Sequence, residues 1–284
     1  MNIIVISIYY PPNNSSTAVQ INNLVNELAC QGHFVNVITQ DYSLKKSFVI
    51  EESKNIRVNR FKIGDVNHNN LFIRALNEFI MPFKIISTIL INSLNFQSNQ
   101  GIIWWSPSIF FTPLVIYLKL INRCKCYLIL RDIFPKWAKD LKIIKSNFTY
   151  FILKIFFLLQ CFFADIIAVQ SINNKKFIPK KILFKKINID VLNNWYTPQI
   201  NDQELGIDFS KTSLNKRKIF IHAGNIGIAQ GIKTFIQVAE ILKDKNEIGF
   251  LFIGRGTQFE EMKRIAKQKF LSNILFLDQI PNSK

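Results

Sequence analysis

Three glycines fall within the stretch HAGNIGIAQG, residues 222–231, which separates two apolar runs of different periodicity. The run KIFI before it is typical of a buried strand. After it, apolar residues recur on one face of a helix, at Ile232, Phe235, Ile236, Ala239 and Leu242. A strand, a glycine-rich loop and a helix in this order predict a unit of a doubly wound α/β sheet. Such sheets bind ligands at the carboxyl ends of their parallel strands.

The same alternation of strand and helix patterns runs along the whole chain of 284 residues. We expect strands at residues 2–8, 34–39, 56–63, 101–105, 126–130, 165–170, 189–194, 218–224, 248–254 and 273–277. Residues 197–217 are polar and lack apolar periodicity, which predicts a linker between two Rossmann-like, doubly wound domains at 1–196 and 218–284. The second half offers only three strands, so we expect that domain to be incomplete.

The charge balance is strongly basic, because 36 Lys and Arg residues against 19 Asp and Glu residues give a net charge of +17. Such a protein is attracted to nucleic acids, phosphorylated substrates or anionic membranes, although an AT-rich genome would also enrich lysine codons. Six lysines alternate with large apolar residues over 173–186, which fits either a solvated helix face or an anionic lipid surface. No nucleic-acid recognition motif accompanies the charge, so we expect no nucleic-acid partner.

The residue pattern predicts neither a metal centre nor a membrane span. The four cysteines and three histidines lack metal-ligand spacing, which indicates reduced thiols in a cytosolic protein. Residues 101–118 and 147–170 are apolar, but prolines break the first and polar or charged residues interrupt the second. The second segment therefore fits a helix on a bilayer surface better than one that crosses it. The N-terminal run is typical of a first strand and not of a signal peptide.

Two glycine-containing loops form the candidate anion site of the second half. Gly224, Gly227 and Gly231 place free backbone N–H groups and a helix N-terminus at the end of a strand, and this arrangement favours phosphate. The next strand ends in the sequence GRG at 254–256, where Arg255 would add a planar cation at the same edge. The loops match neither the dinucleotide fingerprint nor a Walker A motif. Purely geometric glycines and a solvated arginine are the alternatives.

Polar and aromatic side chains also follow several strands of the first half. The loop PPNNSSTA supplies either helix-capping oxygens or one wall of a cleft. A charged pair after the strand at 126–130 is either a local ion pair or a site, and an aromatic residue nearby offers a flat surface to a sugar. An asparagine after the strand at 189–194 is a hinge or a cleft wall. These candidates are Ser15, Ser16, Thr17, Arg131, Asp132, Trp137 and Asn194.

A set of motifs in this order along the chain resembles glycosyltransferase family 4. The motifs are YYPPNNSSTAVQINNLVNELACQGHFVNVIT, SPSIFFTPL, YLILRDIFPKWAKDLKII, ADIIAVQS, VLNNW, AGNIGIAQGI and FLFIGRG. Together they are similar to the branch of bacterial O-antigen and capsule transferases, such as the N-acetyl-fucosamine transferases. The resemblance extends over the whole chain.

The resemblance implies a GT-B fold and retaining transfer of a sugar from a nucleotide-sugar donor, with no metal and no cofactor. It implies a saccharide acceptor, often lipid-linked, that docks on the first domain. The protein would then be cytoplasmic and peripheral to the anionic inner face of the membrane. Asp132 and Arg131 would act as catalytic residues that orient the donor sugar or the acceptor hydroxyl. The donor diphosphate would lie at Gly224, Asn225, Gln230, Gly231, Gly254, Arg255 and Gly256.

Several positions depart from the family pattern. Asn225 and Gln230 stand where the family has Arg and Lys, so backbone N–H groups, with Arg255, would have to neutralise the diphosphate. The first loop has Ser-Ser where the family often has Gly-Gly, and Arg131 stands where many members have His. The family's Glu-rich donor motif would lie beyond residue 284. An inactive remnant that binds nucleotide or membrane is therefore the main alternative. A GT-B epimerase and a nucleic-acid-binding protein are weaker ones.

Overall fold

The computed structural model describes residues 1–66, 68, 70–106, 108–195 and 207–280. The chain divides into two compact units, residues 1–197 and 198–284. Of the predicted linker at 197–217, residues 197–206 lie outside the described residues. The remainder packs against the second unit, because Leu214 is fully buried and Arg217 donates a hydrogen bond to the carbonyl oxygen of Ile248 at 3.1 Å.

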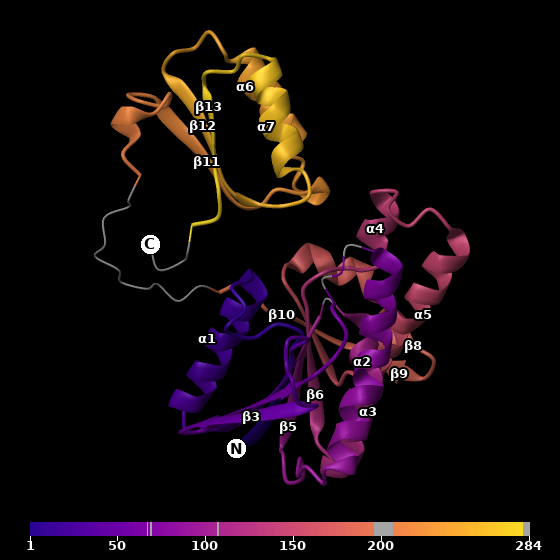
Figure 1. The fold of residues 1–284 in the computed structure, drawn as a ribbon. Coiled ribbons are helices and arrows are strands. Elements are labelled where there is room, and N and C mark those ends of the chain that lie inside the picture. Colours follow the sequence, from indigo (N-terminus) through magenta and orange to yellow (C-terminus); the bar gives the residue numbers. More distant parts are fainter. Residues whose placement is uncertain (67, 69, 107, 196–206, 281–284) are drawn as a thin grey trace. The chain divides into compact units, whose positions relative to one another are not determined.

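The first unit is built around an eight-stranded sheet (Figure 1). Its strands are β1 (Asn2–Ile6), β2 (Phe34–Gln40), β3 (Phe48–Ser53), β4 (Ile56–Phe61), β5 (Gly101–Trp105), β6 (Lys125–Leu130), β7 (Ile166–Val169) and β10 (Asn188–Val191). Their order is β10-β7-β6-β5-β1-β2-β4-β3, and only β3 and β4 pair antiparallel. Every strand expected in this half forms, which confirms the prediction of a doubly wound α/β sheet.

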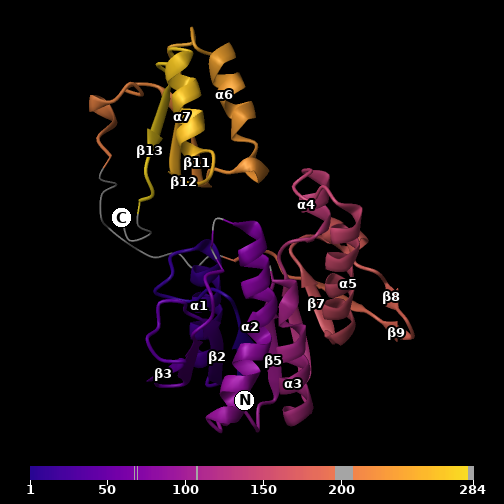
Figure 2. The ribbon, with the colours of Figure 1, turned by 45° about the vertical axis from the view of Figure 1, so that its right-hand side comes forward.

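Helices cover both faces of this sheet (Figure 2). They are α1 (Ser16–Cys30), α2 (Leu71–Ile91), α3 (Thr112–Asn122), α4 (Lys136–Asp140) and α5 (Asn147–Phe163), with short 3-10 helices η1 (Ile109–Phe111) and η2 (Ile172–Phe177). Successive side chains of a strand point to opposite faces. Ile3 and Val5 of β1 therefore pack with α1, whereas Ile4 and Ile6 lie in the core that α2, α3 and α5 cover.

Two parts of the first unit differ from the expectation. β3 was not expected, and it pairs along the outer edge of β4. The lysine-rich segment 173–186 is not a helix face, so that interpretation is wrong. It forms η2 and then a hairpin of β8 (Lys181–Ile182) and β9 (Lys185–Lys186). Pro179 explains the break, because the residue before a proline is disfavoured in the helical region.

The second unit repeats the strand–loop–helix pattern around a parallel sheet of order β11-β12-β13. Its elements are η3 (Phe209–Lys211), β11 (Lys218–Asn225), η4 (Ile228–Gln230), α6 (Ile232–Ile241), β12 (Ile248–Arg255), α7 (Phe259–Gln268) and β13 (Ile274–Leu277). α6 and α7 lie side by side on the sheet (Figure 1) and bury Ile232, Ile236 and Phe252. The strands and helices expected in this half are confirmed.

The cysteines are free thiols, as expected. Cys30 is exposed, and Cys124, Cys126 and Cys161 are buried. In the described part of the chain, no helix has the length and apolar character that a membrane crossing requires.

Candidate functional site

The two glycine loops of the second unit meet at the carboxyl edge of its sheet. β11 and β12 run parallel in a register that pairs Gly224 with Gly254 and Asn225 with Arg255. The chain then passes through η4 to Gly231, which has a φ of 62° and directly precedes α6. The structure therefore brings together the residues of both loops that were predicted to bind a diphosphate.

Two of these glycines are required by the close approach of the loops. A Cβ atom on Gly254, whose φ is +143°, would lie 1.9 Å from the carbonyl oxygen of Gly224. A Cβ atom on Gly256 would lie 2.3 Å from the carbonyl oxygen of Ile226. No side chain fits at such distances from the backbone. The geometric interpretation therefore holds at both positions, whatever the loops bind.

The loop between β11 and α6 leaves several backbone N–H groups free. The amide of Ile226 donates to the carbonyl oxygen of Arg255 at 2.9 Å, which fixes the start of the loop. Among the described residues, the amides of Ile228, Ala229 and Lys233 donate no hydrogen bond, and all three residues are exposed. Unpaired N–H groups at the start of a helix favour an anion. The loop therefore has the donor arrangement of a phosphate site.

Neutral side chains frame this donor arrangement. The Nδ2 of Asn225 donates to the Oε1 of Gln230 at 3.1 Å, and the Nε2 of His222 lies 3.3 Å from the carbonyl oxygen of Asn225. The side chain of Arg255 is exposed and has no ion-pair partner within the described ranges. Its positive charge is therefore available to an anion at this edge.

Arg131 and Asp132 follow β6 at the carboxyl edge of the first sheet, but no ion pair joins them in the described structure. Arg131 instead donates a hydrogen bond to the Oε1 of Gln20, and its guanidinium lies 5.7 Å from the ring centroid of Trp105. Crowding by protein atoms raises the pKa of the Asp132 carboxyl even though the residue is exposed, and the charge of Arg131 lowers that pKa only in part. A carboxyl with a raised pKa is suited to accept a proton from a hydroxyl group.

Gln20 is the residue of this edge that sequence reasoning missed. The indole Nε1 of Trp195 donates to the Gln20 carbonyl oxygen at 3.3 Å, and the rings of Trp105 and Trp195 meet edge to face at 5.6 Å. Gln20 thereby joins α1 to the ends of β6 and β10. The available signal was its position three residues after Thr17, which places both on one helix face.

The serine-rich loop after β1 acts first as a helix cap. The Oγ of Ser15 accepts a hydrogen bond from the amide of Ala18 at 3.3 Å, which confirms the capping interpretation for this residue. Ser16 and Thr17 lie in the first turn of α1. All three stand at the carboxyl end of β1, the same sheet edge as Asp132, because β1 and β6 are both parallel to β5.

The two remaining predicted wall residues lie on different elements. Asn194 follows β10 at this edge, where its Oδ1 accepts a hydrogen bond from the Nε2 of Gln170 at 2.6 Å. Trp137 belongs to α4, is 38% exposed, and its ring lies 6.1 Å from that of Phe134. An exposed indole beside a second ring offers a flat apolar surface. In the described structure, no hydrogen bond or ring contact joins Trp137 to the other candidates.

A polar pocket of about 240 Å³ opens beside the ends of β1 and β2 and was not expected from the sequence. It is lined in part by Tyr10, Gln40 and Arg60. The guanidinium of Arg60 pairs with Glu51 at 2.9 Å. Burial raises the pKa of Tyr10 to about 12, which the charge of Arg60 only partly opposes. Its lining residues come from the loop after β1, from the end of β2 and from β4, and no motif of the sequence links these three segments.

The arrangement offers anion binding on the second unit and a carboxyl with a raised pKa on the first. Among the residues that the structure describes, no group of three or more His, Cys, Asp or Glu side chains is placed to hold a metal ion. The chemistry that the candidate residues offer is hydrogen bonding, electrostatic stabilisation and proton transfer.

Residues 206–284 match the family model described as glycosyl transferases group 1. This match contains both glycine loops of the second unit. Among curated proteins, none matches the sequence.

Solved glycosyltransferase structures share the fold over nearly the whole chain. Sucrose-phosphate synthase from Thermosynechococcus elongatus superposes with a TM-score of 0.67 at 13% identity, over 99% of this chain and 71% of that one. WaaG, a glycosyltransferase involved in lipopolysaccharide biosynthesis, gives 0.62 at 10% identity, over 98% and 70%. HepE from Anabaena, solved with UDP and glucose, gives 0.61 at 12% identity, over 99% and 70%. The chain has the α/β fold of GT-B glycosyltransferases, and the group 1 match of residues 206–284 together with this fold supports a glycosyl-transfer function.

Proposed function

We propose that this chain is a retaining glycosyltransferase of bacterial surface polysaccharide biosynthesis. It transfers a hexosyl or N-acetylhexosaminyl group from a nucleotide-sugar donor to a lipid-linked saccharide acceptor. The motifs shared with the O-antigen and capsule branch of family 4 support this assignment. The proposed location is the cytoplasmic face of an anionic membrane, to which the protein binds peripherally.

The observation that carries the proposal is the set of free N–H groups between β11 and α6. The amides of Ile228, Ala229 and Lys233 have no protein acceptor among the described residues, and the exposed Arg255 ends the neighbouring strand. When the bond between the sugar and the nucleoside diphosphate breaks, negative charge accumulates on the departing phosphate. Fixed N–H dipoles and a cation stabilise that charge without having to reorganise.

On the first unit, Arg131 and Asp132 would act on the sugar or on the acceptor hydroxyl. The contacts of Arg131 with Gln20 and Trp105 hold its guanidinium in place at the strand ends. The Asp132 carboxyl, with its raised pKa, would orient the attacking hydroxyl by accepting its hydrogen bond. Ser16, Thr17 and Asn194 would form the wall on which the acceptor saccharide rests.

The proposal is tested by measuring sugar transfer from a panel of UDP- and GDP-sugars to a lipid-linked acceptor, together with calorimetry of UDP and GDP binding. We expect Arg255→Ala to weaken binding of the preferred nucleotide about tenfold, because a charged hydrogen bond to phosphate is lost. Arg264→Ala removes an exposed arginine of α7 and is the matched control. Absence of transfer with every donor would contradict the proposal.

A non-catalytic nucleotide-binding protein is the second candidate. The neutral pair Asn225–Gln230 favours it, because the family pattern has two cations at these positions. This candidate predicts nucleotide binding that Arg255→Ala weakens, but no transfer and no donor hydrolysis. Calorimetry and the transfer assay on the same preparation therefore distinguish the two functions.

A further inference from the structure

The outward side of α5 is apolar along most of its length. Large exposed side chains recur at helical spacing, at Phe148, Phe151, Ile152, Ile155 and Leu159. Lys154 is the one charged residue between 147 and 163. At 1.5 Å per residue the helix is about 25 Å long. A helix on a protein surface usually turns polar residues outward, so an exposed apolar stripe of this length indicates an interaction surface.

α2 widens this apolar face. The ring of Phe79 in α2 lies 5.9 Å from the ring of Phe156 in α5, so the two helices meet through aromatic side chains. Phe72, Leu76 and Phe83 of α2 are each more than two-fifths exposed. They recur at helical spacing and continue the apolar surface beyond α5.

The β8–β9 hairpin carries an apolar tip between lysines. Leu183 and Phe184 form its turn, and their side chains are 73% and 98% exposed. Lys181 pairs with Lys186 across the hairpin, and both side chains point into solvent. A large aromatic side chain with almost no protein contact, held at the tip of a hairpin and flanked by cations, is typical of a residue that enters a lipid interface.

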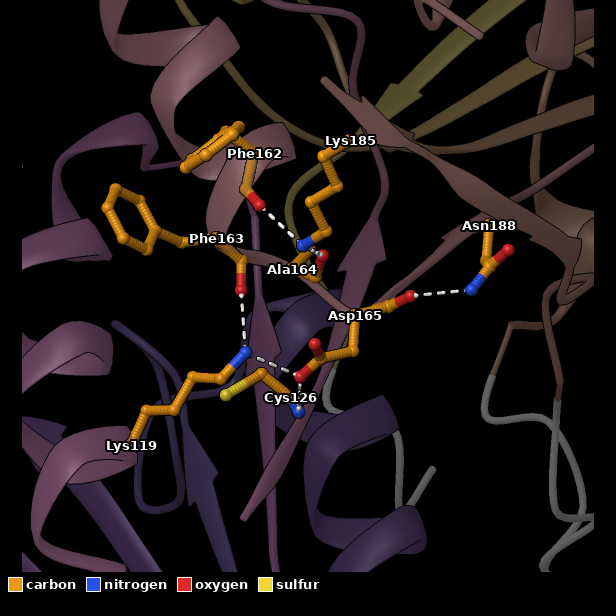
Figure 3. A network of polar contacts seen from close by, with 8 residues as sticks. All are labelled: Lys119, Cys126, Phe162, Phe163, Ala164, Asp165, Lys185 and Asn188. Atoms are coloured by element: carbon orange, nitrogen blue, oxygen red, sulfur yellow. Dashed lines mark hydrogen bonds and ion pairs between the residues drawn. The ribbon is translucent and has the colours of Figure 1, made fainter. Parts of the chain in front are cut away.

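The hairpin is joined to the C-terminal end of α5. The Nζ of Lys185 donates to the carbonyl oxygens of Phe162 and Ala164, each at 2.5 Å, and lies 5.7 Å from the Phe162 ring centroid (Figure 3). Figures 1 and 2 both show the hairpin beside α5. The hairpin is therefore held against the C-terminal end of α5.

An open pocket of about 690 Å³ lies at this junction. Its lining combines three cations with apolar residues: Lys119, Arg123, Lys185, Ile116, Leu120, Cys124, Phe162 and Phe163. Asp165 offsets one of these cations by pairing with Lys119 at 2.7 Å (Figure 3). Cations above an apolar floor complement the phosphate and the acyl chains of an anionic lipid.

Lysines also stand at the other end of α5. Lys142 and Lys145 precede the helix and are exposed. Lys139 donates to the Oδ1 of Asn147 at 2.7 Å, and its Nζ lies 6.0 Å from the ring centroid of Tyr150. The apolar stripe is therefore bordered by positive charge at both of its ends.

We propose that the α5 stripe and the hairpin tip form one docking surface for an anionic lipid bilayer. α5 would lie in the plane of the headgroups, Leu183 and Phe184 would enter the acyl region, and the surrounding lysines would contact lipid phosphates. The positive border argues against a second copy as the occupant, because two such surfaces would repel each other. The inference deepens the proposed function, since it names the surface that brings the chain to a lipid-linked acceptor.

The test is co-sedimentation of the full chain with vesicles of phosphatidylcholine alone and with vesicles that contain phosphatidylglycerol. We expect binding to the anionic vesicles only, and weaker binding at high salt because the attraction is screened. The double variant Leu183→Ser/Phe184→Ser and the triple variant Lys180→Gln/Lys181→Gln/Lys186→Gln should each lower the partition coefficient about tenfold.

Matched controls are available on the second unit. Phe270→Ser replaces an aromatic side chain that is 91% exposed and is the control for the apolar hairpin variant. Lys243→Gln/Lys245→Gln/Lys267→Gln removes three exposed lysines and is the control for the lysine variant. The proposal is overturned if anionic vesicles do not bind the protein, if the controls lose as much binding as the hairpin variants, or if the hairpin variants abolish self-association instead. Calorimetry with UDP measures nucleotide binding at the loop between β11 and α6 on the same samples. Failure of the docking surface and failure of the proposed function are therefore distinguishable.

Discussion

The side-chain Nδ2 of Asn225 donates a hydrogen bond to the Oε1 of Gln230 across the loop that precedes α6. The distance of 3.1 Å is ordinary, but the pairing has a consequence for charge. Two neutral side chains form a hydrogen bond with each other at the two positions where glycosyltransferase family 4, which this chain resembles, has two cations. The proposed anion site therefore depends on backbone N–H groups and on Arg255.

The first prediction concerns this missing charge. Gln230→Lys should increase affinity for UDP or GDP about tenfold, because an ammonium group beside the free amides adds a charge-assisted contact to phosphate. Calorimetry measures the change. Gln258→Lys adds the same charge in the other loop at a residue just before α7 and serves as the comparison. Equal affinity for wild type and Gln230→Lys would mean that the diphosphate does not lie at this loop.

The second prediction concerns Asp132. The carboxyl acts on a hydroxyl only when it is ionised, and its pKa is raised. Transfer activity should therefore be lost as the pH falls through the raised pKa of Asp132, and be retained at higher pH. Asp132→Asn should lower kcat by about a hundredfold or more while UDP affinity stays unchanged. If Asp132→Asn keeps both the kcat and the acidic limb of the pH profile of the wild type, Asp132 takes no part in the transfer reaction.

The third prediction separates geometry from binding in the glycine loops. Gly254→Ala should reduce the free energy of unfolding by about 2–4 kcal/mol, because the new Cβ would collide with the Gly224 carbonyl oxygen at 1.9 Å. Gly101→Ala in β5 is the control, since a Cβ there meets nothing within 4 Å. Urea unfolding measures both. If Gly254→Ala is as stable as Gly101→Ala, the close approach of the two loops is not rigid.

The sequence predicted the sheets well because buried parallel strands consist of continuous runs of apolar residues, which are easily recognised. It failed at β3, whose burial is slight and whose pairing depends on its neighbour β4. It also failed at the β8–β9 hairpin, where alternating lysines and apolar residues satisfy a helix pattern over a short window. Gln20 escaped notice for another reason. Its role comes from contacts with Arg131 and Trp195, residues more than a hundred positions away.

The last prediction concerns stability in acid. Asp165 accepts hydrogen bonds from the Nζ of Lys119 and from the amide of Cys126, both at 2.7 Å. Partial burial alone would raise the pKa of this carboxyl, but these two bonds and the charges of Lys119 and Lys185 outweigh it and lower the pKa.

A lowered pKa in the folded state means that the ionised carboxylate stabilises the fold above the unfolded pKa. The stabilisation is lost as the pH falls through the folded value. Asp165→Asn should therefore reduce the free energy of unfolding by about 1–2 kcal/mol near neutral pH, and by less as the pH falls below the ordinary aspartate pKa of 3.8. Asp140→Asn breaks the exposed pair with Lys136 and should cost about 0.5 kcal/mol or less. Urea unfolding across acidic pH measures the two variants side by side. A deficit in Asp165→Asn that does not shrink with falling pH would show that the lost stability comes from packing and not from the charge that Lys119 compensates.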